Sequence, residues 1–109
     1  MANTYKILGQ SQPGTAVADV YTVPASTSAV VSTISATNVD GVASNINIYV
    51  VASGDTAGAA NALVYSAELG ANTLQAFTLG VTLGAADKIS VQSATGSAVT
   101  YQVFGQEIS

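Results

Sequence analysis

The 109-residue sequence contains no cysteine, no histidine and no tryptophan, and its only cationic side chains are Lys6 and Lys88. Without cysteine there is no disulfide framework, no thiolate nucleophile and no cysteine-based zinc site. Without histidine the chain lacks the commonest general base and the commonest transition-metal ligand. Two lysines and a net charge of −4 form no basic patch, so nucleic acid is not an expected partner.

Long apolar runs are also missing. No stretch reaches the roughly 18 uncharged apolar residues that a membrane helix needs. Residues 1–12 contain a lysine and no apolar run, unlike a secretory signal peptide. We therefore expect a protein that is made and folded in a cytoplasm, without a signal peptide and without a membrane partner.

What the sequence does have is apolar material with very little charge. Hydrophobic residues make up 49% of the chain and charged residues only 7%, against about a quarter charged in ordinary soluble proteins. This composition can build a core and is unlike that of disordered chains. The surface must then consist of Ser, Thr, Asn, Gln and Ala, and so few charges favour self-association.

Apolar residues alternate with polar ones along most of the chain, which is typical of β-strands with one buried face. Ile46, Ile48 and Val50 alternate in this way, and so do Ile89 and Val91. Turn residues separate the runs and predict eight strands. We place these strands at residues 4–10, 18–23, 28–38, 45–53, 62–68, 73–80, 87–94 and 98–107.

This pattern predicts an all-β fold, with residues 1–109 forming a single antiparallel β-sandwich of jelly-roll or immunoglobulin-like type. Residues 1–12 are either an N-terminal arm or an edge strand. Asp40-Gly41 and Thr95-Gly96-Ser97 are expected hairpin turns. Residues 56–62 are expected to be a loop or a single helical turn, and Gly80 a bulge or bend.

No catalytic, cofactor or metal site stands out. A Ser-His-Asp triad requires a base that the chain lacks. The six carboxylates are scattered, with no close acidic spacing of the calcium-loop kind. If loops bring Asp40, Asp55 and Asp87 together at one end of the sandwich, they are the one candidate calcium site. We expect no enzyme and no cofactor.

Residues that suit an interface are easier to name. Exposed tyrosines often anchor protein interfaces, and Tyr49 should point away from the core because its neighbours Ile48 and Val50 claim the inner face. Ile7-Leu8 breaks the alternation of its strand, and an apolar residue lies close to the C-terminus. The predicted interface residues are Tyr5, Ile7, Leu8, Tyr49, Phe104 and Ile108.

Several segments resemble small virion proteins of tailed bacteriophages. They are the opening residues 1–10, Tyr21-Thr-Val-Pro-Ala25 with the following β run at 29–34, and the closing residues 79–83, 87–91 and 104–108. The resemblance covers nearly the whole chain. It implies a non-enzymatic β-sandwich on a virus particle, either a capsid decoration (cement) protein or a protein associated with the tail fibre.

Three non-enzymatic functions fit these features. A decoration protein would bind and stabilise the major capsid protein, whereas a tail, neck or fibre component would bind tail proteins. A carbohydrate-binding module, a third and different class, would use an exposed aromatic residue, although tryptophan is absent. For either virion role we expect a homo-oligomer, a dimer or a trimer, because closed symmetry satisfies exposed sheet edges.

Overall fold

The computed structural model describes residues 3–109, except for the side chain of Leu79. The described chain forms eight strands and one 3-10 turn. They are β1 (Asn3–Ser11), β2 (Ala18–Thr22), β3 (Ser28–Asn38), β4 (Ser44–Val51), η1 (Ala59–Asn61), β5 (Ala62–Leu69), β6 (Leu74–Leu83), β7 (Lys88–Ser93) and β8 (Val99–Ile108). All eight predicted strands are confirmed, and the short turn η1 falls inside the loop expected at 56–62.

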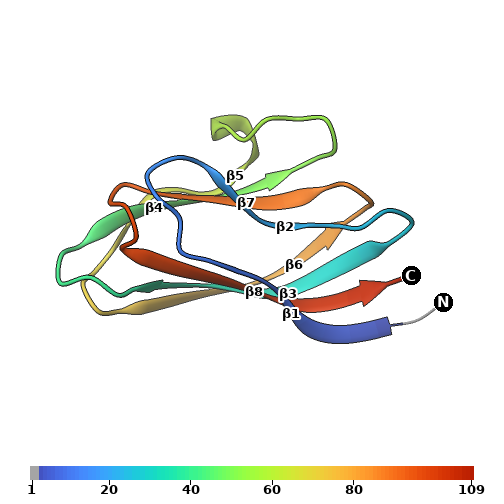
Figure 1. Cartoon of the computed structure of the whole chain (residues 1–109), viewed down its shortest axis with the longest axis horizontal. Helices are drawn as coiled ribbons and strands as arrows, with labels where there is room; N and C mark the ends of the chain where they lie inside the picture. Colours follow the sequence, from blue (N-terminus) through green and yellow to red (C-terminus); the bar gives the residue numbers. More distant parts are fainter. Residues whose placement is uncertain (1–2) are drawn as a thin grey trace.

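The strands pack as two four-stranded antiparallel sheets (Figure 1). The first sheet has the order β1-β8-β3-β6 and the second has the order β2-β7-β4-β5. Strand β1 pairs with β8, β2 with β7, β3 with β6 and β4 with β5. The first half of the chain thus runs beside the second half in reverse order, which is the eight-strand jelly-roll arrangement rather than the immunoglobulin-like one.

This topology overturns the two hairpin turns expected from the sequence. Asp40-Gly41 joins β3 to β4 and Thr95-Gly96-Ser97 joins β7 to β8, and in both cases the two strands belong to different sheets. These tight turns therefore carry the chain across the sandwich. Only β4 and β5 are both consecutive and paired within one sheet, and they are joined by the longer connection that contains η1.

The core lies between the two sheets and contains aliphatic side chains from both. Ile34 and Val103 come from the first sheet, and Ile48 and Val91 from the second. Tyr101 is also fully buried, and its hydroxyl donates a hydrogen bond to the carbonyl oxygen of Gln92 at 2.9 Å. This bond satisfies the one polar group that the ring brings into the core.

Bulges explain where the alternation fails. In β1 the pairing with β8 shifts between Ile7 and Gly9, so Leu8 is an extra residue and packs against the core. The β3–β6 pairing is irregular between Val31/Val81 and Thr33/Thr78, which includes Gly80 and confirms the bend expected there. In β5 a register shift lies between Val64 and Ala67. Leu63 and Tyr65 are consequently exposed, and Val64 packs on the core instead.

Candidate functional site: an uncharged sheet face

The outer face of the first sheet carries no charged side chain. The only charged residues of its four strands are Lys6 and Glu107. They form an ion pair at 2.9 Å, and both point to the inner side: Glu107 pairs with the buried Ala29, and its carboxylate accepts a hydrogen bond from Tyr21 of the second sheet. The outward side chains are all apolar, amide or hydroxyl groups. This face therefore presents no electrostatic barrier to a partner.

Large apolar side chains gather at one end of this face. Tyr5 is 79% exposed and Ile7 is 54% exposed. Ile7 pairs with the partly exposed Phe104, and Ile108 follows Phe104 on the same side of β8. Single exposed apolar residues are common, but a group of them on one flat sheet indicates an interaction surface.

A shallow hollow of about 300 Å³ lies within this group. It is lined by Tyr5, Lys6, Val30, Ser32, Phe104, Gly105 and Gln106, and the one charged residue among them, Lys6, is paired with Glu107. The side-chain oxygen of Gln106 is buried there and has no hydrogen-bond partner among the described residues. A buried acceptor without a donor is costly. A partner that inserts an apolar group would fill the hollow.

Four of the six predicted interface residues lie on this face, namely Tyr5, Ile7, Phe104 and Ile108. The other two do not. Leu8 is turned inward by the bulge in β1. Tyr49 does lie on the outer side of its strand in the second sheet, but it is only 3% exposed. The connection that contains η1 contacts β4 on that side, so the expectation of an exposed Tyr49 is wrong.

The candidate calcium residues do not converge. Asp40 precedes β4 and Asp55 follows it, so the two lie at opposite ends of the sandwich. Asp87 lies beside the loop that contains Asp55, and its two carboxylate oxygens accept hydrogen bonds from the backbone N–H groups of Ser53 and Gly84, each at 2.8 Å. Within residues 3–109 no cluster of three potential metal ligands is found. Asp40 and Asp87 shape turns, because their carboxylate oxygens accept hydrogen bonds from nearby backbone N–H groups.

The second sheet differs in character, since its outer face carries the charged residues Asp19, Glu68 and Lys88. The Ser90 hydroxyl donates a hydrogen bond to Asp19, and this bond, together with nearby Lys88, lowers the pKa of that carboxyl. A polar hollow of about 240 Å³ lies on the same sheet. Charge and polarity thus separate the two faces of the sandwich.

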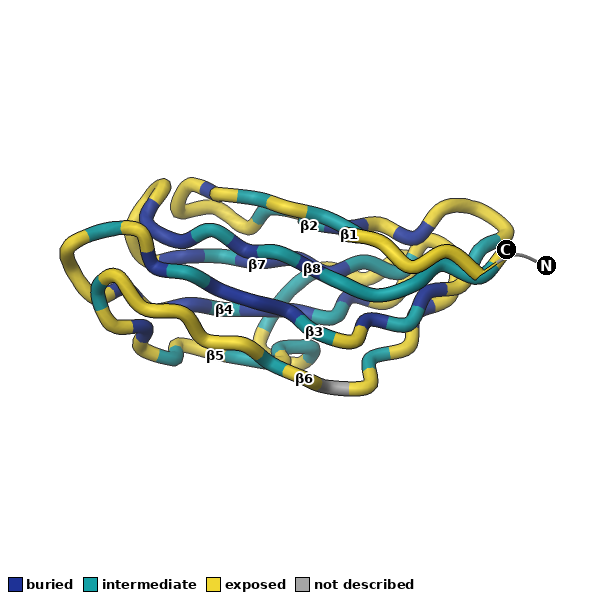
Figure 2. The backbone as a smooth tube through the Cα atoms, turned by 90° about the horizontal axis from the view of Figure 1, so that it is seen from below, coloured by how far each residue is buried: buried dark blue, intermediate teal, exposed yellow. Residues whose placement is uncertain are grey.

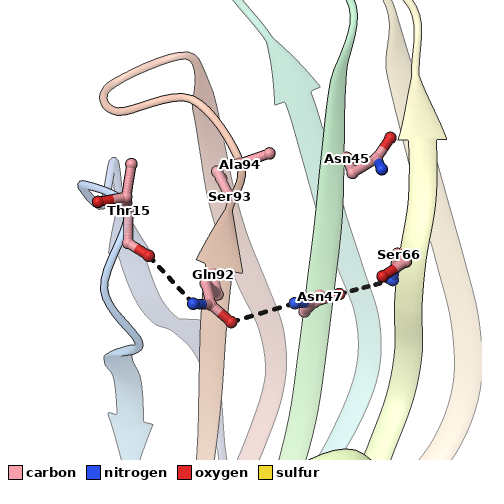
Figure 3. A pocket seen from close by; sticks show the side chains of 7 residues that line it. All are labelled: Thr15, Asn45, Asn47, Ser66, Gln92, Ser93 and Ala94. Carbon is pink, nitrogen blue, oxygen red and sulfur yellow. Dashed lines mark hydrogen bonds between the residues drawn. The ribbon is translucent and has the colours of Figure 1, made fainter.

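Figure 3 shows a chain of hydrogen bonds across the polar hollow. The Gln92 side chain donates to the carbonyl oxygen of Thr15 at 3.0 Å and accepts from the Asn47 amide at 3.1 Å. Asn47 in turn accepts from the backbone N–H of Ser66 at 2.6 Å, and the Tyr49 hydroxyl also donates to Gln92. These amide groups already have protein partners, so few of them are free to bind a ligand.

Sequence reasoning missed Val30, Ser32 and Gln106, which complete the apolar hollow. Their outward positions follow from strand alternation, but their proximity does not. Val30 and Tyr5 lie on either side of Gln106 in the register, and that register depends on pairing between the first, third and last strands. No local sequence signal reports such pairing.

Within the described residues 3–109, no helix is long and apolar enough to cross a membrane.

No protein-family model matches the chain, and no curated protein matches it. Among solved structures it is similar to a chain of infectious bursal disease virus, Gx strain, with a TM-score of 0.50 and 12% identity over 97% of this chain and 30% of the viral one. A chain of the Gt strain of the same virus gives a TM-score of 0.48 with 11% identity, covering 96% of this chain and 31% of that one. The chain thus shares its fold with a segment of a virus protein and spans less than a third of that protein's length.

Proposed function

We propose that this chain is a non-enzymatic structural protein of a virion, and specifically a capsid decoration protein that binds the major capsid protein and stabilises the shell. The observation that carries this proposal is the uncharged outer face of the first sheet, with its exposed Tyr5 and Ile7 and its apolar hollow. The shared fold with a virus chain and the resemblance to small phage virion proteins support the same conclusion. Because a fold alone does not determine function, the proposal depends on the uncharged outer face of the first sheet.

The surface suits binding to a large, repetitive partner. Apolar burial contributes about 25 cal/mol per Å² removed from water, so a few exposed rings and aliphatic chains provide useful affinity. A shell presents the same site many times, and even modest contacts of each copy would then reinforce the lattice. Neither histidine nor cysteine is available for catalysis, and the carboxylates of Asp40 and Asp87 accept hydrogen bonds from backbone N–H groups of their turns.

The two other functions have weaker support. A tail, neck or fibre component would use the same uncharged face, and binding to tail proteins rather than to shells would identify it. A carbohydrate-binding module would use the polar hollow of the second sheet. There the amides of Asn47 and Gln92 are already hydrogen-bonded, and the ring of Tyr49 is buried.

The test is co-sedimentation with empty shells assembled from the major capsid protein of the same virus. We expect saturable binding with a fixed number of copies per shell. The double variant Tyr5→Ser/Ile7→Ser should raise the dissociation constant at least tenfold. Tyr65→Ser is the matched control, because Tyr65 is similarly exposed at 58% but lies in the second sheet. Equal losses in both variants, or no binding of the natural protein to shells, would contradict the proposal.

A further inference from the structure

The two sheets end in four edge strands, β1 and β6 in the first sheet and β2 and β5 in the second. An edge strand exposes unpaired backbone N–H and C=O groups that can pair with another chain. Natural proteins protect such edges with short strands, charges, bulges or inward-pointing charged residues.

Three of the edges are protected. β1 carries Lys6, whose ammonium group is held inward by Glu107, and a bulge at Leu8. β2 has only five residues and a register shift between Asp19 and Tyr21. β5 contains Glu68, two register shifts in its pairing and a left-handed residue, Ser66, with φ of 53°. Each of these features disfavours continuous pairing with an added strand.

β6 differs from the other three. It has ten residues, none of them charged and none a proline. Indeed the whole stretch 70–86 lacks charged residues and proline. Its first half, Leu74–Thr78, pairs with β3 in continuous register, and the irregularity comes only after Thr78.

The outer side of this segment is open. Leu74 is 62% exposed, and Ala76 and Thr78 on the same side of the strand are also exposed. In the described part of the chain, no backbone hydrogen bond from a turn or loop reaches residues 74–78. Figure 2 shows β6 along the rim of the sandwich. This segment therefore has the composition and geometry of a strand that accepts a neighbour.

We propose that residues 74–78 of β6 pair antiparallel with the same residues of a second copy of this chain, joining the two first sheets into one continuous eight-stranded sheet. We choose a second copy as the partner because an antiparallel pair of identical strands is symmetric about a two-fold axis. The unpaired backbone N–H and C=O groups of each strand then pair with those of the other. An uncharged edge brings no like charges together when the two copies are identical. Pairing centred on Ala76 places Leu74 of each copy opposite Thr78 of the other. The exposed Leu74 side chain is therefore partly covered in both copies.

This contact is separate from the proposed shell-binding surface, which lies around Tyr5 at the other edge of the same sheet. The dimer can therefore fail while shell binding holds, and the reverse is also true. Both copies would present their outer faces on the same side of the joined sheet. A dimer could consequently dock on a shell through two sites at once.

The experiment measures the mass of the purified full chain by light scattering over a range of concentrations, for the natural protein and two variants. Ala76→Lys places a charge on the outer side of β6, and Gln10→Lys adds the same charge to the outer side of β1, the opposite edge. We expect a concentration-dependent dimer for the natural protein. Ala76→Lys should raise its dissociation constant at least tenfold, whereas Gln10→Lys should leave it within twofold. Circular dichroism of each variant checks that the sandwich remains folded.

A cross-linking measurement keeps the proposal testable if Ala76→Lys does not fold. Because the chain has no cysteine, a single Ala76→Cys variant reports on one contact only. Under mild oxidation it should form a disulfide-linked dimer much faster than Gln10→Cys does. A natural protein that is monomeric at all concentrations, a trimer that persists in Ala76→Lys, or equal cross-linking at both positions would overturn the proposal.

Discussion

The Tyr21 hydroxyl donates a hydrogen bond to the Glu107 carboxylate at 2.7 Å and thereby joins β2 of one sheet to β8 of the other. Lys6 of β1 adds an ion pair to the same carboxylate. The hydrogen bond from Tyr21 and the contact with Lys6 hold the pKa of Glu107 below its ordinary value. Burial and the neighbouring carboxylate raise the pKa of Tyr21. This cluster connects the two sheets.

The cluster predicts loss of stability at both ends of the pH range. Because the pKa of Glu107 is lower in the folded state, its stabilising effect is present above the unfolded-state pKa of about 4.3 and is lost as the pH falls. Because the pKa of Tyr21 is higher in the folded state, its effect is present below about 10 and is lost as the pH rises further. The free energy of unfolding, measured with urea from acid to alkaline pH, should be constant near neutral pH and should fall at both extremes.

Tyr21→Phe tests the assignment directly. Removing the hydroxyl should cost about 1–2 kcal/mol at neutral pH, since the bond has a charged acceptor at a partly exposed site. The acid-side loss should also become smaller, because the pKa of Glu107 returns toward its ordinary value. An unchanged acid limb in the urea series would mean that Tyr21 does not control this carboxylate.

Ile48 is fully buried in the hydrophobic core and lies opposite Val91 on the neighbouring strand. Ile48→Asp should unfold the chain. The cost of burying an unpaired carboxylate is comparable to or larger than the whole free energy of unfolding of a typical domain, which is about 5–15 kcal/mol. Val42→Asp, at an exposed loop position, should fold normally. Circular dichroism and thermal unfolding of both variants provide the comparison. A cooperatively folding Ile48→Asp protein would refute the proposed packing.

Two glycines of the first sheet form a matched pair. A Cβ atom on Gly105 would collide with the carbonyl oxygen of Val30 on the neighbouring strand, whereas a Cβ on Gly80 would meet open space. Gly105→Ala should therefore destabilise the fold by at least about 1–3 kcal/mol, as overpacking does. Gly80→Ala should change the free energy of unfolding by less than about 0.5 kcal/mol. Urea denaturation of both variants measures the two changes in stability. Equal changes would contradict the close approach of Gly105 in β8 to Val30 in β3.

Asn38 is a buried polar residue at the end of β3. Its amide donates to the carbonyl oxygens of Val42 and Leu69, at 3.0 and 3.1 Å, and its side-chain oxygen accepts from the backbone N–H of Asp40 at 2.8 Å. Asn38→Ala leaves these groups without partners and should cost about 2–4 kcal/mol. Asn45→Ala, at an exposed position, should cost little. A small effect of Asn38→Ala in urea denaturation would show that water replaces these bonds.

Sequence patterns predicted the strands well because alternation and turn residues are local signals. The break at Ile7-Leu8 was visible in the sequence, and the structure explains it as a bulge. Where a bulge falls inside a strand, local patterns fail. Residues 63 and 65 are apolar, yet the register shift in β5 leaves both exposed and places Val64 inward.

Properties that depend on strand order could not be predicted. Asp40-Gly41 has the chemistry of a hairpin turn, but its two strands join different sheets. The burial of Tyr49 depends on a connection that comes after its strand and covers that face. The grouping of Tyr5 with Phe104 requires β1 to lie beside β8, nearly the whole chain apart. Such long-range pairings decide which residues form a surface.

The most direct test of the proposed role is electron cryomicroscopy of empty shells saturated with the purified chain. We expect additional density at regular positions on the shell, with the outer face of β1, β8 and β3 against the major capsid protein and Tyr5 within the contact. Shells without additional density, or a chain that touches the shell through its second sheet, would contradict the proposal.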